Sequence, residues 1–456
     1  MAGLPLPRPQ LAEAVPADVV DVIETLRAGG HAGYVVGGSL RDVLLGLTPH
    51  DWDLATDARP ERILELFPEA VYENAFGTVA VRHRDQTFEI TTFRRDHEYA
   101  DFRRPHRVEF GDAIETDLAR RDFTINAMAW GRTATGPTFD LIDPFDGRRD
   151  LDAGILRAVG DPSVRFGEDA LRMIRAMRLS AVLGFAIEAD TLSAIEARSE
   201  LVRHLSGERI AAELEKLLAT AVPSIGLRPL EATGLLAGIS PELAAQRGIA
   251  QNKIPGEDLW DHTLRAVDAA PRDHPVVRLA ALVHDIGKPS TFADGRFIGH
   301  DAVGADLAAA LLDRLRFPRS PTERVTHLVR QHMFAYESSW GDPAVRRFIA
   351  KIGPAALDEL FELRQADNVG SGLPPDAGGI DELRRRVAEQ LAAEVALHRR
   401  DLAVDGDDLI AELGAVPGPR LGAVLDRLLE EVVDDPALND RPTLLLLAQA
   451  QLAQEE

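Results

Sequence analysis

The chain has 456 residues, no cysteine and a formal net charge of −23. The length predicts two to four domains, and the lack of cysteine excludes disulfides and thiolate metal sites and favours a cytoplasmic enzyme. The acidity argues against a globally basic nucleic-acid-binding surface, and neither a transmembrane run nor a signal peptide is expected.

The charge is unevenly distributed along the chain. Residues 91–180 carry 15 arginines and 16 acidic residues, so nearly all of the excess acid lies elsewhere. A local phosphate-binding surface is therefore compatible with this segment.

The first 160 residues alternate between helical and strand patterns. The expected helices cover residues 18–27 and 41–47, and the expected strands cover residues 33–36, 50–55, 78–82 and 87–93. These patterns together predict a mixed α/β domain.

Helical periodicity dominates after residue 161, for example over 170–183, 206–218 and 276–286. The segment 367–379 is rich in Gly, Pro and Asp and is expected to be a loop or linker. The fold class is thus α+β and multidomain. The expected divisions are a mixed α/β head over 1–160, a helical neck over 161–245, a helical domain over 246–380 and a helical tail over 381–456.

Asp51 and Asp53 are two residues apart in the expected strand 50–55. Alternation along a strand places both carboxylates on one face, where they can hold Mg²⁺ together with substrate phosphates. A D-x-D pair alone is common on solvated strands, so the context decides its meaning.

That context is the segment Gly37-Gly38-Ser39-Leu40-Arg41-Asp42 just upstream. Glycines after a strand allow a phosphate to approach the backbone, and the start of the next helix favours anions. Arg41 can pair with triphosphate oxygens.

VVGGSLRDVLLG…HDWDLATDA resembles the first motif of the class II, polymerase-β-like nucleotidyltransferases, which include bacterial tRNA CCA-adding enzymes and poly(A) polymerases. Five later segments resemble further motifs of that family in the same order: a loop region at 91–110, the second motif at 117–130, a connecting motif at 141–162, a nucleotide-selecting motif at 165–185 and a neck motif at 206–214. The resemblance covers roughly residues 30–220.

The resemblance implies template-independent nucleotidyl transfer with two metal ions and release of pyrophosphate. It makes Asp51 and Asp53 the catalytic carboxylates and the Mg²⁺ ligands. It also implies that Gly38, Arg41 and Arg121 contact the nucleotide. A third carboxylate is not identified by the motifs, and Glu89 in FEITTF is a candidate.

Asp169, Arg172, Arg175 and Arg178 recur every three residues in a helix-period segment, which places neighbours on one face. A carboxylate accepts a hydrogen bond from the amino group of cytosine or adenine, and an arginine donates to the adjacent ring nitrogen. An Asp-Arg pair can therefore accept CTP and ATP and reject UTP and GTP. Arg175 and Arg178 are expected to share triphosphate or base contacts with Arg172.

The acceptor is harder to assign. Poly(A) polymerases of this group usually carry a basic, aromatic segment after the first motif, which FPEAVYENAFGTVAVRHRD lacks, and the loop region keeps Arg94, Arg95, Arg103 and Arg104. We therefore expect CCA addition to the 3′ end of tRNA from CTP and ATP. Poly(A), A-only and CC-only addition remain as alternatives, and the oligomeric state is unreadable.

The C-terminal half contains a string of histidines and aspartates, H…HD-x-GK…H…D, that resembles HD-domain phosphohydrolases. His262, His284, Asp285 and Asp367 are the expected ligands of a second divalent metal (Ni²⁺, Mn²⁺ or Mg²⁺), and His300 and His332 lie in the same string. Two competing functions follow: a phosphohydrolase with a regulatory head, and a noncatalytic RNA-binding protein.

Overall fold

The computed structural model describes residues 8–49, 51–74, 77–84, 86–97, 107–251, 253–393 and 395–454. The chain forms two compact units, residues 1–244 and 245–456. The finer division into head, neck, helical domain and tail stays a prediction. Among the described residues, no helix combines the length and apolar character that crossing a membrane requires.

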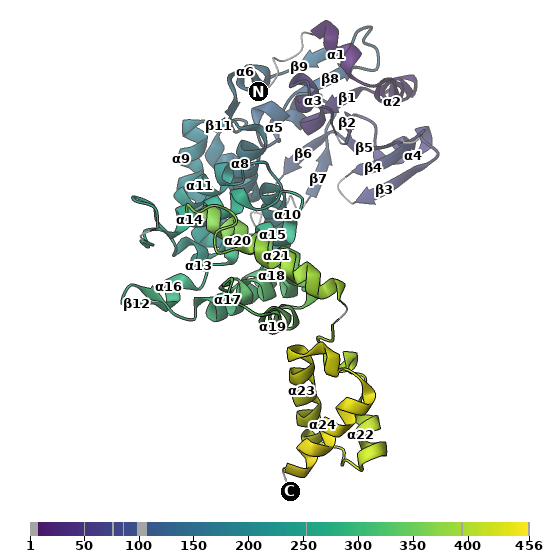
Figure 1. Cartoon of the computed structure of the whole chain (residues 1–456). Helices are drawn as coiled ribbons and strands as arrows, with labels where there is room; N and C mark the ends of the chain where they lie inside the picture. Colours follow the sequence, from purple (N-terminus) through teal and green to yellow (C-terminus); the bar gives the residue numbers. More distant parts are fainter. Residues whose placement is uncertain are drawn as a thin grey trace. The chain divides into compact units, whose positions relative to one another are not determined.

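The centre of the first unit is a seven-stranded mixed sheet (Figure 1). Its strand order is β3 (Ala70–Asn74), β4 (Thr78–His83), β5 (Gln86–Thr92), β2 (Asp53–Thr56), β1 (Gly33–Val36), β8 (Ala129–Arg132) and β9 (Asp140–Ile142). Only β2 and β5 pair in parallel; the other neighbours are antiparallel. Separate two-stranded sheets join β6 (Arg94–His97) to β7 (Arg107–Phe110) and β10 (Ile155–Leu156) to β11 (Ala186–Ile187).

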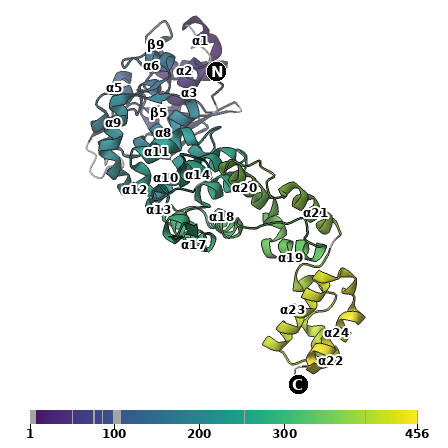
Figure 2. The same cartoon turned by 60° about the vertical axis from the view of Figure 1, so that its left-hand side comes forward.

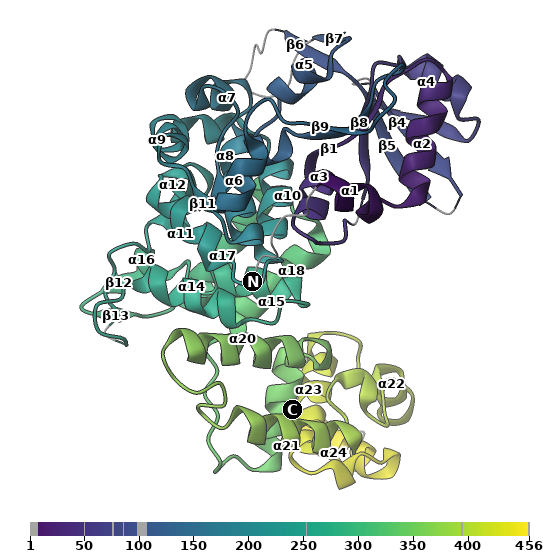
Figure 3. The ribbon, with the colours of Figure 1, turned by 90° about the horizontal axis from the view of Figure 1, so that it is seen from above.

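Helices of this unit cover the sheet and continue beyond it. The remaining bounds are α1 (Arg8–Ala14), α2 (Ala17–Ala28), α3 (Gly37–Leu44), α4 (Pro60–Leu66), α5 (Ile114–Ala119), α6 (Gly147–Ala153), α7 (Pro162–Glu168), α8 (Leu171–Leu183), α9 (Ala189–Arg198), α10 (Gly207–Leu218), α11 (Ser224–Ala232), α12 (Leu235–Ile239) and α13 (Pro241–Ala244). Figure 3 shows α2 and α4 side by side, and Val22, Ile23 and Leu26 of α2 are fully buried in the core.

The expected strand 50–55 is shorter than predicted, because β2 begins only at Asp53. Tyr34 and Val35 of β1 pair with Ala55 and Leu54, so continued pairing would bring Asp51 and Trp52 opposite residues beyond Val36. The chain has already turned into α3 there. Asp51 therefore lies in an exposed bend before the strand.

Local sequence explains where the site-bearing helices begin and end. The Asp161 carboxylate accepts hydrogen bonds from the backbone N–H groups of Ser163 and Val164 at the start of α7, and Pro162 occupies the first turn. Gly184, with φ of 69°, ends α8 in the left-handed conformation that glycine tolerates.

The second unit is helical apart from one short hairpin. Its elements are α14 (Leu259–Ala269), α15 (Pro275–Val283), α16 (Lys288–Thr291), β12 (Phe292–Ala293), β13 (Arg296–Phe297), α17 (His300–Arg314), α18 (Arg319–Gln331), α19 (Asp342–Ile352), α20 (Leu357–Gly370), α21 (Ile380–Ala392), α22 (Gly406–Leu413), α23 (Pro419–Asp434) and α24 (Arg441–Gln454). The last three helices pack together around a core that includes Leu409, Leu428 and Leu444 (Figure 2).

The loop expected over 367–379 is also shorter than predicted. Helix α20 runs on to Gly370 and so includes Asp367. Its last turn is held because Asn368 donates to the carbonyls of Pro375 and Ala377, which folds the following loop back onto the helix.

Candidate functional site

A cavity of about 340 Å³ lies beside β2 and α8 in the first unit. Its charged lining consists of Arg94, Arg120, Arg121, Arg172, Arg175 and Arg209, with Asp53, Asp122 and Asp169. Six arginines against three aspartates make the lining basic, although the chain as a whole is strongly acidic. The arrangement suits a polyanion such as a nucleoside triphosphate.

Asp53 is the first residue of β2 and reaches this cavity. Burial raises the pKa of its carboxyl, Arg121 opposes that rise, and the negative charge of nearby Asp51 adds to it. A carboxylate whose negative charge is disfavoured by burial and by a neighbouring carboxylate fits a divalent cation. Asp51 and Asp53 thus have the donor chemistry that Mg²⁺ requires.

The candidate third carboxylate lies on the adjacent strand. Glu89 of β5 is the parallel-register partner of Asp53, so the two side chains project from the same face of the sheet. The Glu89 residue is exposed.

The glycine pair of the first motif forms the start of α3. Gly37 has φ of +73°, and a Cβ atom there would lie 2.9 Å from Nη1 of Arg121 and 3.4 Å from Oδ2 of Asp53. A side chain would therefore fill the space between these two groups. Sequence reasoning selected Gly38, which faces the Arg41 guanidinium, and missed Gly37, although the Gly-Gly signal contained both.

The two arginines expected to contact the nucleotide differ in position. Arg41 is buried, donates to Asp42 at 2.7 and 2.9 Å and to Asn126 at 2.8 Å, and is not part of the cavity lining. Arg121 lines the cavity, and its Nη2 donates to Asp117 at 3.1 Å. Arg121 is thus the better placed of the two for a phosphate.

Asp169 and Arg172 both line the cavity, but only Arg172 belongs to α8. The expectation that Asp169 shares the helix with the arginines is wrong. Its backbone is extended, and its carboxylate accepts a hydrogen bond from the Leu171 N–H at 3.1 Å as the helix begins. Its other oxygen pairs with Arg209 of α10 at 2.7 Å.

Arg172 is held by contacts with the segment before it and with the second motif. It donates to Glu168 at 2.6 Å and to the backbone carbonyl of Arg120 at 2.8 Å. These contacts hold the Arg172 guanidinium in the lining of the cavity that Asp169 also lines.

Arg175 reaches the cavity, whereas Arg178 does not line it. Arg175 pairs with Asp122 at 2.6 Å, and Arg178 donates to Glu213 of α10 at 2.5 Å. Burial alone would raise the pKa of Asp122, but the Arg175 guanidinium and the Asn126 amide hold it well below its usual range.

Sequence reasoning missed Arg120, Arg209 and Asp122 as cavity residues. Arg120 and Asp122 flank the expected Arg121, so the second motif held a usable signal. The partnership of Arg209 with Asp169 spans 40 positions and had no local signal. Of the loop arginines, Arg94 lines the cavity, whereas Arg103 and Arg104 lie outside the described residues.

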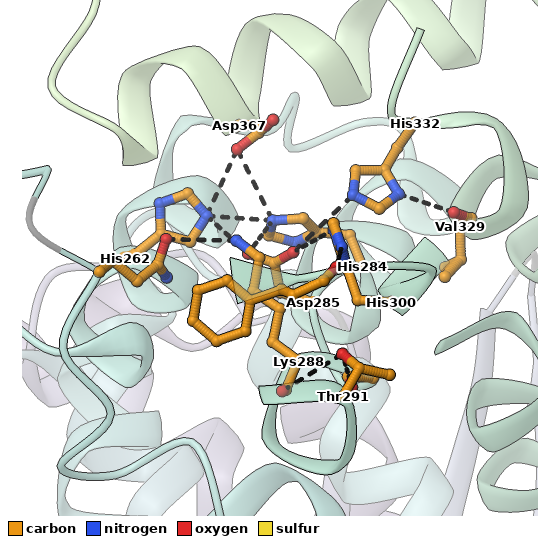
Figure 4. Close-up of polar contacts among 12 residues, drawn as sticks. His262, His284, Asp285, Lys288, Thr291, His300, Val329, His332 and Asp367 are labelled. Carbon is orange, nitrogen blue, oxygen red and sulfur yellow. Dashed lines mark hydrogen bonds and ion pairs between the residues drawn. The ribbon is translucent and has the colours of Figure 1, made fainter. Parts of the chain in front are cut away.

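The expected ligands of the C-terminal half gather in one buried cluster (Figure 4). Nε2 of His262 lies 3.1 Å from Nε2 of His284, 3.2 Å from Oδ2 of Asp285 and 3.4 Å from Oδ1 of Asp367. His262 comes from α14, His284 and Asp285 follow α15, and Asp367 belongs to α20. A ligand atom from His262, His284 and Asp367 can meet at one metal position.

His300 and His332 join this cluster from the start of α17 and the end of α18. Burial lowers the pKa of His332 to about 4, so its imidazole is neutral at pH 7. Gly287 permits the packing, because a Cβ atom there would lie 2.3 Å from the carbonyl oxygen of His300.

Three families match the chain in order along its length. They are described as the poly A polymerase head domain over residues 33–157, a probable RNA- and SrmB-binding site of polymerase A over 184–247, and the HD domain over 235–370. The chain is therefore an RNA nucleotidyltransferase with a polymerase-type head and an HD domain.

Similar proteins narrow this class. A CCA-adding enzyme of Levilactobacillus brevis is 35% identical, covering 93% of this chain and 95% of its own, and one of Geobacillus kaustophilus is 34% identical, covering 92% and 93%. The crystal structure of the Bacillus stearothermophilus CCA-adding enzyme in complex with CTP is 29% identical with a TM-score of 0.71, covering 96% of this chain and 98% of its own. This chain belongs to the CCA-adding enzymes.

Proposed function

We propose that the chain adds CCA to the 3′ end of tRNA from CTP and ATP, and that the cavity beside β2 and α8 binds the incoming nucleotide. The six arginines that line this cavity together with Asp53, in a strongly acidic chain, support this assignment. Poly(A) addition is not favoured, because the relatives at about 35% identity are CCA-adding enzymes. We infer a cytoplasmic location from these substrates.

Asp51 and Asp53 hold Mg²⁺ in this proposal, and Glu89 is the candidate third carboxylate. A divalent cation, when bound, favours ionisation of the attacking 3′ hydroxyl and neutralises the leaving pyrophosphate. Arg121 and Arg175 line the cavity together with Asp53, and in this proposal they pair with triphosphate oxygens.

Asp169 and Arg172 select the base. The Asp169 carboxylate accepts from the exocyclic amino group of cytosine or adenine, and the Arg172 guanidinium donates to the neighbouring ring nitrogen. Uracil and guanine present the reverse pattern and leave both protein groups unsatisfied, which costs binding free energy. This scheme requires no nucleic-acid template.

We also propose a role in nucleotide binding for Gly38, Arg41 and Arg178. For the two arginines, the effect on the nucleotide is indirect. Arg41 holds Asn126, which donates to Asp122, the partner of Arg175. Arg178 shares Glu213 with Arg175. We propose that both arginines position Arg175 through these contacts.

The test is incubation of the protein with tRNA lacking its CCA end, with CTP and ATP singly and together, followed by sequencing of the product. CTP alone should add two residues, and both nucleotides should complete CCA. A product with a long A tract would overturn the proposal. An enzyme that adds A to an acceptor already ending in CC, but adds no C, would overturn it as well.

A further inference from the structure

Asp117 is a buried carboxylate of the first unit that does not itself line the cavity beside β2 and α8. It belongs to α5, and its side chain is 1% exposed. Its Oδ1 accepts hydrogen bonds from Nε and Nη2 of Arg120 at 2.9 and 2.8 Å, and its Oδ2 accepts from Nη2 of Arg121 at 3.1 Å. One carboxylate thus holds two of the six arginines that line the cavity.

The spacing along the chain makes this tether short. Arg120 and Arg121 follow Asp117 by three and four positions, the separations at which side chains meet on one face of a helical turn. Burial alone would raise the pKa of the Asp117 carboxyl, but the two guanidinium groups lower it below its ordinary value. Desolvation offsets much of the attraction in a buried ion pair, so stability alone does not account for this arrangement.

Arg121 reaches from Asp117 towards Asp53, the proposed Mg²⁺ ligand. A Cβ atom added to Gly37 would lie 2.9 Å from Nη1 of Arg121 and 3.4 Å from Oδ2 of Asp53, so these two atoms face the same small space. Among the described residues, however, the carboxylate that pairs with Arg121 is Asp117 and not Asp53. Nε of Arg121 is buried and has no hydrogen-bond partner among those residues, which leaves it for a phosphate oxygen.

The consequence of this arrangement is electrostatic. A guanidinium group that is released by one carboxylate pairs with another carboxylate within its reach. For Arg121 that carboxylate is Asp53, and the pair would neutralise the charge with which Asp53 attracts a divalent cation. By accepting from Nη2, Asp117 keeps Arg121 near Asp53 without an ion pair between them.

Asp117 also reaches two further parts of the cavity wall. Its Oδ1 lies 3.3 Å from the backbone nitrogen of Arg94, which donates to it at the start of β6. The backbone carbonyl of Arg120 accepts from Arg172 at 2.8 Å. Loss of the Asp117 charge therefore affects several arginines at once, and a test has to isolate the effect that passes through Arg121.

We propose that Asp117 is a positioning residue for nucleotidyl transfer. It holds Arg121 where the guanidinium contacts a triphosphate oxygen, and it leaves Asp53 free to bind Mg²⁺. Asp117 contacts neither the nucleotide nor the metal ion, because arginines occupy both of its oxygens. This inference rests on the proposed function, in which the cavity binds the nucleotide and Asp53 is a Mg²⁺ ligand.

The first test is the Mg²⁺ dependence of CTP incorporation into tRNA that lacks its CCA end. Asp117→Asn keeps the size of the side chain and removes its charge, so Arg121 should turn to Asp53 and compete with the cation. The Mg²⁺ concentration for half-maximal rate should rise about tenfold, because an opposite charge at this range shifts the ionisation of a carboxylate by at least that factor. Saturating Mg²⁺ should displace Arg121 and restore most of the rate.

A double variant isolates the effect of Arg121. Arg121→Gln alone should raise the KM for CTP but not the Mg²⁺ requirement, because it removes the competing cation. The variant D117N/R121Q should have the Mg²⁺ requirement of R121Q. A tenfold rise in the double variant relative to R121Q would overturn the proposal, and so would a native Mg²⁺ requirement in D117N.

The matched control is Asp150→Asn. Asp150 is also a buried aspartate of the first unit, pairs with Arg157 at 3.0 Å and does not line the cavity. This variant should show the native Mg²⁺ requirement, whatever its effect on stability. A rise equal to that of D117N would assign the effect to general destabilisation and overturn the proposal.

The second test is structural and includes the native protein, in case Asp117→Asn does not fold. In a crystal structure of the native protein with Mg²⁺ and a nonhydrolysable CTP analogue, Arg121 should keep its ion pair with Asp117 while Asp53 binds the metal ion. In metal-free D117N, Arg121 should pair with Asp53. A native Arg121 released from Asp117, or a D117N structure without the new pair, would overturn the proposal.

The two levels of the argument fail in different ways. Absence of CCA addition by the native protein would refute the proposed function and this inference with it. Normal CCA addition by the native protein, combined with any of the contrary results above, would refute the role of Asp117 alone.

Discussion

Asp169 and Arg209 form a 2.7 Å ion pair that ties the proposed base-selecting carboxylate to helix α10. The two side chains are each about one-fifth exposed and both line the cavity. Arg209 therefore orients Asp169 and adds a positive charge to the proposed nucleotide site.

Arg209→Ala should lower kcat/KM for both CTP and ATP by about tenfold, because Asp169 loses the partner that fixes its carboxylate. Steady-state incorporation into tRNA lacking CCA measures the effect. Arg203→Ala is the control, since Arg203 is exposed and pairs with Glu200. An effect of equal size in both variants would argue against a specific role for Arg209.

Asp169→Ala should remove the acceptor for the amino group of cytosine and adenine while leaving the fold intact. The preference for CTP over UTP should fall by about 10²-fold or more, because a site built for hydrogen bonding discriminates through its unsatisfied groups. Competitive incorporation of the two nucleotides measures the ratio. Unchanged discrimination would exclude Asp169 from base selection.

Asp51→Ala and Asp53→Ala should each reduce nucleotidyl transfer by about 10³-fold, because each removes a ligand worth several kcal/mol of charge stabilisation in the transition state. RNA binding and metal binding by the second unit should persist. A variant that transfers at the native rate would refute its carboxylate as a catalytic ligand. Persistent hydrolysis with lost transfer would separate the two units' activities.

Asp122→Asn should destabilise the protein at pH 7 by about 2 kcal/mol, because it breaks a charge-assisted pair with Arg175. The expected loss of unfolding free energy is at the lower end for such pairs, because the Arg175 side chain is about one-third exposed and water screens the interaction.

The pKa of Asp122 is lowered in the folded state, so its stabilising effect is fully present above the unfolded value of about 4. It is lost as pH falls through the folded value. Urea unfolding of native and variant protein should therefore give a constant difference from pH 8 to about 5 and a smaller one below about 4. A difference that changes between pH 5 and 8 would contradict this linkage.

The buried cluster of histidines and aspartates in the second unit should support hydrolysis of a 2′,3′-cyclic nucleotide when Ni²⁺ or Mn²⁺ is added, and chelation should abolish this hydrolysis. Asp285→Asn should have the same effect as chelation, because one oxygen of Asp285 faces His262 and the other faces His300. Liquid chromatography of the product measures turnover. Absence of turnover by the fully metal-loaded native protein would leave the cluster with a structural role.

The sequence by itself determined the features that depend on local order. Strand β1, the glycine pair, the helices α8 and α10, and the string of histidines and aspartates all follow from periodicity, turn residues and motif spacing. These patterns were enough for the α+β fold class and the family, because each is formed by residues near one another in the chain.

Only the tertiary structure decided which groups meet. Strand register places Glu89 beside Asp53, and helix packing joins Arg209 to Asp169 across 40 positions. Packing of separate elements also directs Arg41 to Asn126 and Arg178 to Glu213, which lie outside the cavity lining. In the second unit, it brings His300 and His332 to Oδ1 of Asp285. Such contacts depend on how separate elements pack, and no local pattern encodes them.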